Sequence, residues 1–462
     1  MICRIDSPRL YFTGNQRLSV AEPLVVEEGL TVVEGPIGSG KTLFARILEK
    51  GWNYRTNRIT ASSFKRPSVL HLEFRDVHSW MGASVGYYQQ RYEASMNDDV
   101  PTVGQILGDR AGRQEFLQYA RRLGIDDAVA KKINYLSSGE LRKLLIVNAI
   151  VDNPDLLVLD NPYIGLDAPS KQTLNEALAE LRQAGQSIML IINDDSQLPH
   201  EIDNRLYLDN MRVSAAAPEA AEETPDTLRR FPMPADPYKG ELLKMEGVEV
   251  SYGDVKVLDN INWTVRSGER WSLTGPNGSG KSTLLSLVFA DNPRSYSNRL
   301  WLFGLRRGSG ESIWDIKRRI GFVSPEMQLH FHASASVAQI VANGLNDTVG
   351  MYVRPRPDQM EKAAGWLRHF RIDHLADRDF ATLSSGERQL ALIARTFIKE
   401  PSLLILDEPM HALDVNARRR VEGTIDRFLA DRPDAAFIMV SHNPADLPSS
   451  ITHHLHLQRH AT

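Results

Sequence analysis

The sequence has almost no cysteine and no long apolar run. Cys3 is the single cysteine in 462 residues, which excludes an internal disulfide framework, a four-cysteine zinc site and a protein-held iron–sulfur cluster. No apolar stretch approaches the roughly 18 residues needed to cross a bilayer. Residues 1–20 alternate charged and apolar types and have no signal-peptide centre. We therefore expect a cytoplasmic protein.

Excess positive charge is also lacking. The formal net charge is −4, so there is no overall basic surface for DNA or RNA, and nucleic acid is not an expected partner, although a local basic patch is compatible with this balance. Hydrophobic residues make up 42% and charged residues 24%, as in globular proteins with large cores. The length predicts two large domains or about three of average size.

One glycine-rich stretch predicts a site for a nucleoside triphosphate. It fits the pattern G-x-x-x-x-G-K-[ST] and consists of Gly275, Pro276, Asn277, Gly278, Ser279, Gly280, Lys281, Ser282 and Thr283. An apolar run, Trp271 to Thr274, precedes this loop, and a helix-like run, Thr283 to Phe289, follows it. In such a loop the backbone N–H groups surround the phosphates, Lys281 reaches the β- and γ-phosphates, and Ser282 ligates Mg²⁺. A glycine-rich turn that fits by chance is the alternative.

A second copy of the loop argues against that alternative. After the apolar run Leu30 to Val33 come Gly35, Pro36, Ile37, Gly38, Ser39, Gly40, Lys41 and Thr42. Lys281 follows Lys41 by 240 residues, so the repeat predicts two nucleotide-binding domains, 1–214 and 241–462. Between Ala215 and Pro237 the composition changes to proline, alanine and acidic residues, which predicts a linker over residues 215–240.

In both halves a predicted buried strand ends in a carboxylate. The first of these strands runs from Asp155 to Asp160, and the second ends at Asp407, which is 247 residues further on. Beside a P-loop, such an aspartate is the expected further ligand for the Mg²⁺ of a bound nucleotide. A helix over 170–184 and a strand over 188–192 complete a doubly wound α/β pattern. Leu383 follows Leu136, and Asp414 follows Asp167, by the same 247 residues, which indicates a duplicated unit.

Other segments give local expectations. Pro8 to Phe12 and Pro23 to Val26 predict a small antiparallel sheet, His78 to Tyr92 predicts a helix, and Thr102 to Ala130 has helical periodicity. Thr452 to Leu457 alternates His with Leu, which raises the alternative of a metal site. The strand period, with no cysteine or carboxylate beside it, favours an edge strand.

The segment Leu-Ser-Ser-Gly-Glu occurs at 136–140 and again at 383–387, and the first copy precedes a predicted helix over 141–150. By itself it could be an ordinary helix N-cap, with Ser followed by Glu three residues later. However, in both halves it lies upstream of the acidic strand, and Gly/Ala-Leu-Asp follows that strand. The segment thus resembles the LSGGQ signature of ATP-binding cassette (ABC) ATPases, followed by their D-loop.

This resemblance covers nearly the whole chain and implies an α/β fold of two tandem ABC nucleotide-binding domains. Each domain would have a P-loop NTPase core, an antiparallel β subdomain and a helical signature subdomain. The implied cofactors are ATP and Mg²⁺, the latter held by Thr42 and Asp160 in the first half and by Ser282 and Asp407 in the second. The signature residues implied to contact nucleotide are Ser137, Gly139, Ser384 and Gly386.

For the second half the resemblance implies three further roles. Tyr252 would stack on adenine, Glu408 would be the base that activates the attacking water, and His442 would contact the γ-phosphate. The chemistry requires such groups, because a water attacking phosphorus needs a carboxylate that accepts its proton. A purely structural role for Glu408, as a strand-end charge, is the alternative.

The first half departs from this pattern. Asn161 stands where the second half has Glu408, and Asn193 aligns with His442, so we expect the first half to bind nucleotide and to hydrolyse it poorly. The glutamine that usually follows the first strand of the helical subdomain has no clear counterpart. Gln90 and Glu326 are weak candidates. Tyr11 and Phe12 are both candidates for the adenine contact of the first half.

A closer resemblance lies in residues 296–317, whose sequence looks like that of soluble tandem-cassette proteins associated with molybdenum transport and photorepair. This family implies an ATPase that energises or regulates a membrane permease, and it could therefore lie at the inner membrane through that partner. An ATPase acting on ribosomes or nucleic acid and an ATP-gated regulatory clamp are the two alternatives. The family also implies an intramolecular head-to-tail sandwich, and hence a monomer with an internal pseudo-dimer.

Overall fold

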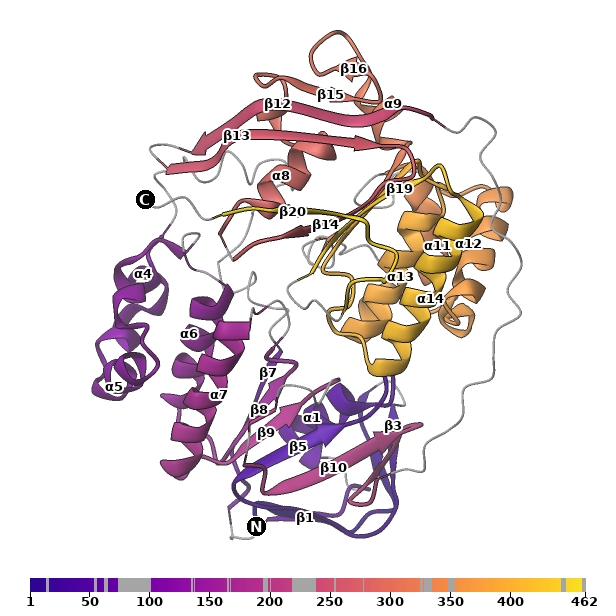
Figure 1. Cartoon of the computed structure of the whole chain (residues 1–462). Coiled ribbons are helices and arrows are strands. Elements are labelled where there is room, and N and C mark those ends of the chain that lie inside the picture. Colours follow the sequence, from indigo (N-terminus) through magenta and orange to yellow (C-terminus); the bar gives the residue numbers. More distant parts are fainter. Residues whose placement is uncertain are drawn as a thin grey trace. The chain divides into compact units, whose positions relative to one another are not determined.

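The computed structural model contains two compact units (Figure 1). The described residues are 1–13, 16–53, 56–61, 65–73, 101–133, 136, 138–163, 166, 168–193, 198–199, 201–217, 238–252, 255–276, 278–324, 327, 335–347, 354–441 and 446–458. The helix expected over 78–92 lies outside them, and so does the 218–237 part of the linker expected over 215–240.

The first unit is built on an eight-stranded sheet in the order β2-β3-β11-β10-β5-β9-β8-β7, and a separate antiparallel sheet in the order β4-β1-β6. The strands from β10 to β7 run parallel. The bounds are β1 Cys3–Ile5, β2 Arg9–Tyr11, β3 Arg17–Val20, β4 Leu24–Val26, β5 Leu30–Glu34, β6 Ile59–Ala61, β7 Val69–Glu73, β8 Leu156–Asp160, β9 Ile188–Ile191, β10 Asn204–Asp209 and β11 Arg212–Ser214. Strands β8 and β9 are apolar and buried throughout, as parallel strands covered on both faces must be, apart from the terminal Asp160.

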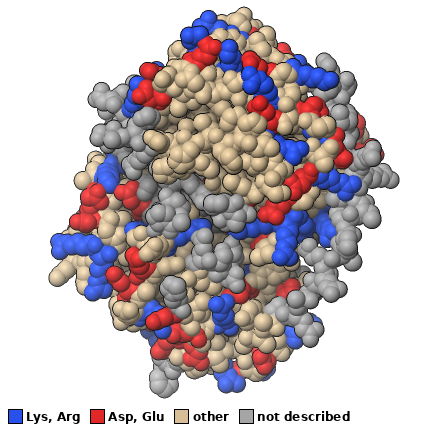
Figure 2. Space-filling view, in the orientation of Figure 1, with Lys and Arg blue, Asp and Glu red and all other residues tan. Residues whose placement is uncertain are grey.

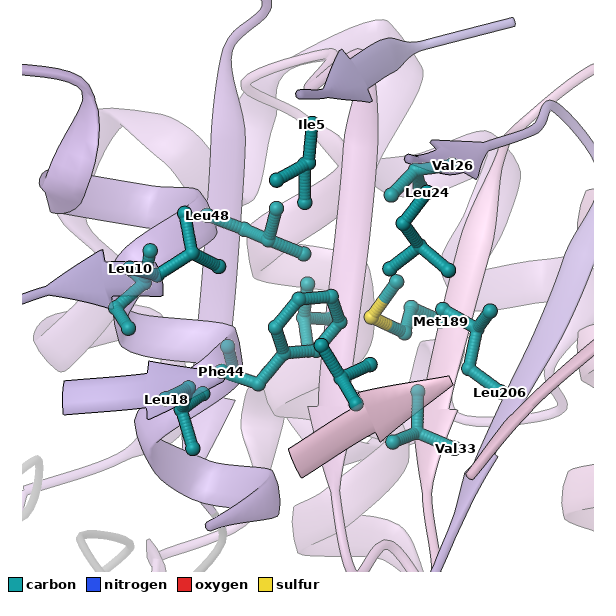
Figure 3. Close-up of a cluster of buried hydrophobic side chains, with 14 of the residues drawn as sticks. Ile5, Leu10, Leu18, Leu24, Val26, Val33, Phe44, Leu48, Met189 and Leu206 are labelled. Carbon is teal, nitrogen blue, oxygen red and sulfur yellow. The ribbon is translucent and has the colours of Figure 1, made fainter. Parts of the chain in front are cut away.

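One face of this sheet packs on helix α1 (Lys41–Lys50) and the antiparallel strands. Figure 3 shows Phe44 of α1 among Val33 of β5, Met189 of β9 and Leu206 of β10, with Ile5 of β1 also in the cluster. These side chains are buried, so they hold the helix that follows the first P-loop against the strand that precedes it.

The opposite face packs on helices α6 and α7. The α-helices and 3₁₀ helices of the first unit, besides α1, are η2 Gly51–Asn53, α4 Val103–Leu107, η5 Gly108–Gly112, α5 Gln114–Arg122, η6 Asp126–Ala130, α6 Ser138–Ile150 and α7 Ala168–Gln183. The sheet is therefore covered on both faces, which confirms the doubly wound α/β pattern.

The second unit repeats the arrangement. Its five-stranded parallel sheet has the order β17-β18-β19-β14-β20, and a four-stranded antiparallel sheet has the order β13-β12-β15-β16. The strands are β12 Glu241–Tyr252, β13 Val255–Arg266, β14 Arg270–Thr274, β15 Leu300–Leu302, β16 Leu305–Arg306, β17 Ile320–Val323, β18 Leu403–Asp407, β19 Ala436–Val440 and β20 His453–His456. The helices are α8 Lys281–Val288, η8 Pro293–Ser295, α9 Ile313–Lys317, α11 Val337–Ala342, η9 Asn343–Leu345, α12 Pro357–His369, η10 Asp373–Leu375, η11 Phe380–Thr382, α13 Ser385–Phe397 and α14 Val415–Asp431.

Two local expectations need correction. The sheet expected from Pro8 to Phe12 and Pro23 to Val26 is not one sheet, because β2 pairs with β3 at the edge of the core sheet while β4 pairs with β1. Helix α6 begins at Ser138 rather than Leu141, inside the signature segment. The expected edge strand near the C-terminal end is confirmed as β20, and the described residues hold no group of three or more metal-binding side chains.

On the face seen in Figure 2, Lys and Arg are interspersed with Asp and Glu, as expected for a net charge of −4. Among the described residues, no helix has the length and apolar character needed to cross a membrane.

A buried ion pair fixes the end of α13 in the second unit. The side chains of Lys399 and Asp347 are 4% and 7% exposed, and they contact each other. Lys399 Nζ also donates hydrogen bonds to the carbonyl oxygens of Lys317, at 3.0 Å, and Ile320, at 2.8 Å. The ammonium group therefore connects the signature helix to the start of β17.

We predict that Lys399→Met lowers the free energy of unfolding by about 3–5 kcal/mol, because the Asp347 carboxylate would stay buried without its cation. Chemical denaturation measures this change. Lys256→Met is the control, since Lys256 and Asp259 form an ion pair whose side chains are 42% and 38% exposed, and its removal should cost less than about 1 kcal/mol. Equal losses in the two variants would contradict a structural role for the buried pair.

Candidate active site

Both P-loops join a central parallel strand to a helix, β5 to α1 and β14 to α8. Their glycines have matching backbone angles, with φ values of 154°, 77° and 102° at Gly35, Gly38 and Gly40, and 148°, 79° and 90° at Gly275, Gly278 and Gly280. A Cβ atom on Gly275 would lie 2.4 Å from the carbonyl oxygen of Leu457. Glycine is required there both for its backbone angle and for space.

The two P-loop lysines lie inside their loops. Lys281 Nζ donates to the carbonyl oxygens of Gly275, at 2.7 Å, and Pro276, at 3.0 Å. Lys41 Nζ donates to Gly35 O at 2.5 Å and to Pro36 O at 3.0 Å. Each positive charge is thus held where a phosphate chain cradled by the loop would need it.

The expected Mg²⁺ ligands of the first half lie together. Thr42 is in the first turn of α1, and its hydroxyl donates to Asp160 Oδ2 at 2.7 Å. A hydroxyl and a carboxylate oxygen are hard ligands of the kind Mg²⁺ prefers, with nucleotide phosphates and water completing the coordination. In the second unit, Ser282 and Asp407 hold the corresponding positions in α8 and at the end of β18.

Asp160 has further polar neighbours. His71 Nε2 on β7 lies 3.7 Å from Asp160 Oδ2, and the amide of Asn161 donates to Asp160 Oδ1 at 2.6 Å. Burial raises the pKa of Asp160, but the contact with His71, the hydrogen bond from Thr42 and the charge of Lys41 outweigh it and keep that pKa below its usual value. The carboxylate is therefore ionised at neutral pH.

The residues after the two strand-end aspartates have the same backbone geometry. Glu408 has φ 49° and donates its N–H to Val440 O at 3.0 Å, while Asn161 has φ 54° and donates to Ile191 O at 2.8 Å. Glu408 is 7% exposed. The two halves thus place a carboxylate and an amide at equivalent points, and an amide does not accept a proton at neutral pH.

The second signature segment is a capping box. The Ser384 side chain accepts from Glu387 N at 3.3 Å, and Ser384 N donates to Glu387 Oε2 at 2.7 Å, at the start of α13. The helix N-cap that this sequence also allowed is therefore present in the structure, and it begins the helix on which Gly386 lies. In the first unit, Gly139 lies in the first turn of α6.

The sequence did not predict a hydrogen bond that connects each signature helix to the turn after the strand that ends in aspartate. Arg142 on α6 donates to Pro162 O at 2.9 Å, and Gln389 on α13 donates to Pro409 O at 3.0 Å. Burial lowers the pKa of Arg142 to about 9. The two donors, Arg142 and Gln389, are 247 residues apart, and so are the two prolines. Aligning the two halves could therefore have revealed this pair of contacts.

A second missed residue lies beside the expected base. His411 Nε2 is 3.0 Å from Glu408 Oε2, and their side chains are 17% and 8% exposed. The available signal was the spacing. His411 follows Glu408 by three residues, and the turn closed by the hydrogen bond from His411 N–H to Glu408 O brings the two side chains together.

Several expected site residues lie outside the described part of the chain. These are Gln90, Ser137, Asn277, Glu326 and His442. Tyr252 ends β12, but its side chain is not described. Asn193 follows β9, Tyr11 ends β2, and Phe12 packs against the core of the first unit, so the adenine contact of the first half stays a prediction.

The fold and the two P-loops, each with a strand that ends in aspartate and a signature helix, define a tandem P-loop nucleoside triphosphatase (NTPase). The model of the "ABC transporter" family matches residues 24–164 and 258–411. The chain therefore belongs to the ABC transporter family, as a tandem-cassette ATPase that binds and hydrolyses ATP.

Named relatives support this placement. The chain is 37% identical over 456 residues to the ABC transporter ATP-binding protein ModF of Escherichia coli strain K12, covering 91% of this chain and 89% of that protein. It is 28% identical over 452 residues to an uncharacterized ABC transporter ATP-binding protein of Schizosaccharomyces pombe, covering 92% and 91%. A model of ribosome-bound archaeal Pelota and ABCE1 includes a chain with a TM-score of 0.59, 18% identity and coverage of 96% of this chain and 75% of that one, which shows a shared fold.

We predict that Gly275→Ala abolishes ATP binding at the second P-loop, because the new methyl group would meet the Leu457 carbonyl at 2.4 Å. Equilibrium binding of a fluorescent ATP analogue measures this, with Lys281→Ala as the reference for a disabled loop. Gly423→Ala on α14 is the matched control, since nothing lies within 4 Å of its Cβ position. The control should bind normally, with stability changed by no more than about 1 kcal/mol. Normal binding by Gly275→Ala would show that the loop adapts.

Proposed function

We propose that the chain carries one hydrolytic and one silent ATP site, both using Mg²⁺. The proposal rests on one observation. Glu408 and Asn161 occupy equivalent positions after the acidic strands, with φ values of 49° and 54°, yet only the glutamate can accept a proton. The two halves therefore differ in whether this side chain can accept a proton, and not in the backbone conformation after the strand.

In the proposal the two cassettes close head to tail, so that each P-loop faces the signature of the other half. Lys281 and Ser282 would hold the phosphates and Mg²⁺ of the hydrolytic site together with Asp407. Ser137 and Gly139 would complete this site from the N-terminus of the first signature helix. An intramolecular sandwich of this kind makes a monomer the expected state.

Hydrolysis at this site would follow from the position of Glu408. It accepts a proton from the attacking water, whose oxygen forms a bond to the γ-phosphorus as the bond to the β,γ-bridging oxygen breaks, leaving ADP and phosphate. His442 is assigned the contact with the γ-phosphate, where fixed donors stabilise the developing charge. Mg²⁺, when bound, would neutralise charge on the phosphates.

The silent site would combine Lys41, Thr42 and Asp160 with Ser384 and Gly386 of the second signature. The ionised carboxylate of Asp160 and its contact with the Thr42 hydroxyl support retention of Mg²⁺ and nucleotide. Because no base follows Asp160, bound ATP would persist there and serve to keep the cassettes together.

We further propose that ATP turnover energises or regulates membrane transport of the molybdate type, through a permease at the inner membrane. The support is 37% identity to ModF, a protein named as an ABC transporter ATP-binding protein, together with the family resemblance of residues 296–317. The likeness to a ribosome-bound chain is one of fold at 18% identity and favours no second function.

We predict that the asymmetry appears in steady-state ATPase rates. Glu408→Gln should reduce turnover by roughly 10² to 10⁴ while leaving ATP bound, because binding uses the phosphate contacts and chemistry uses the base. Gly139→Asp should be nearly as damaging, since it places bulk and negative charge against the γ-phosphate of the hydrolytic site. Gly386→Asp, its matched control, should mainly weaken nucleotide retention at the silent site.

Equal losses from the two glycine variants would mean that both sites hydrolyse or that the sites are tightly coupled. Substantial turnover in Glu408→Gln would remove the assigned base.

We predict that the tagged chain co-purifies from its own cells with permease subunits. Glu408→Gln should retain the partner, since it keeps ATP bound, and a variant carrying Lys41→Ala and Lys281→Ala should lose it. Mass spectrometry of the captured proteins makes the comparison. Capture of ribosomal proteins that follows the same dependence on ATP would contradict the transport assignment.

A further inference from the structure

The turn after β18 brings the side chain of His411 into contact with Glu408, the expected general base. His411 donates its backbone N–H to the carbonyl oxygen of Glu408 at 3.2 Å, and its ring Nε2 lies 3.0 Å from Glu408 Oε2. Both side chains are largely buried, at 17% and 8% exposed. The backbone and the side chain of His411 therefore both contact Glu408.

The separation of 3.0 Å between a ring nitrogen and a carboxylate oxygen is within hydrogen-bonding distance. In the ionised form that a base requires, the carboxylate only accepts, and the ring then donates to it from Nε2–H. Exclusion of water makes such a bond stronger than it would be at the surface. The bond fixes one carboxylate oxygen and thereby the plane of the whole group.

The neighbourhood shows that the pair belongs to a polar cluster of the second unit. Asp446 hydrogen-bonds Ser441 at 3.3 Å and lies 3.5 Å from Arg418. Its carboxyl also interacts electrostatically with both Glu408 and His411. His411 thus contacts Glu408 directly and also feels the charge of Asp446.

The sequence of the first half lacks both members of the pair. The register of 247 residues places Asn161 opposite Glu408 and Ile164 opposite His411. The first half has no carboxylate at the base position for a histidine to orient, and no histidine at the matching place. The joint change favours a functional link between the two residues over a histidine that only fills space.

We propose that His411 is a positioning residue for Glu408. By donating to Oε2, it turns the other carboxylate oxygen toward the water that attacks the γ-phosphate. This inference rests on the proposed function, in which Glu408 is the general base. A misplacement of a reacting group by about 1 Å can cost roughly 10²-fold in rate, so the loss of this bond should lower kcat more than KM.

Two conservative variants separate the contact from the side-chain volume. In His411→Gln the amide nitrogen can reach the place of Nε2, whereas in His411→Asn it reaches only the place of Nδ1. We expect His411→Asn to lose roughly 10- to 100-fold in kcat, with KM changed less than about threefold, and His411→Gln to recover most of that loss. His374→Asn, at an exposed histidine of the same unit, is the control and should retain full activity.

A double-mutant cycle with Glu408→Gln identifies the route of the effect. Single-turnover hydrolysis would be measured for His411→Asn, Glu408→Gln and the combined variant, with thermal unfolding and ATP binding as checks on folding. If His411 acts through the base, the combined variant should be no slower than Glu408→Gln alone.

Each outcome has a distinct meaning. Wild-type kcat in His411→Asn, equal losses in the Asn and Gln variants, or additive losses in the cycle would overturn the positioning role while leaving the assigned base intact. High turnover in Glu408→Gln would instead overturn the proposed function, and with it this inference.

Discussion

The candidate site depends on one constraint, which is that a charged ligand can stand only where a fully buried parallel strand ends, at the sheet edge that carries the phosphate-binding loop. Strands β8 and β18 are apolar up to Asp160 and Asp407, where the sheet ends and polar groups can be satisfied. The P-loop strands β5 and β14 end at the same edge, each one strand removed from the acidic strand. Phosphate and metal ligands from distant parts of the sequence are thus brought together by the parallel order of the strands.

The signature helices are positioned from the same strand ends. Arg142 and Gln389 each donate to the carbonyl of the proline that follows the base position. The charged guanidinium of Arg142 and the neutral amide of Gln389 thus make equivalent hydrogen bonds. The accepting proline carbonyl is the same in both halves, whereas the donor differs. The first half therefore retains the scaffold of a hydrolytic cassette even though its base position holds an amide.

Local signals made much of this predictable. The P-loops were recognisable because only glycine accepts their backbone angles, and the central strands because buried parallel strands are continuously apolar. Contacts between distant residues were not predictable. Lys399 and Asp347 are 52 residues apart, and nothing in either neighbourhood indicates that they meet. His71 likewise reaches Asp160 only because β7 pairs with β8, which a single sequence does not reveal.

Backbone strain gives a physical reason for the difference between the halves. A non-glycine residue with positive φ costs on the order of 1–3 kcal/mol, and asparagine tolerates this region better than glutamate because its short side chain can bond locally. Asn161 does so through its amide bond to Asp160 Oδ1. Glu408 adopts nearly the same angle with a longer side chain, which His411 Nε2 contacts at 3.0 Å. Under the proposed function, strain is thus retained in the half where a carboxylate would act in hydrolysis, and it is relieved in the half that would only bind nucleotide.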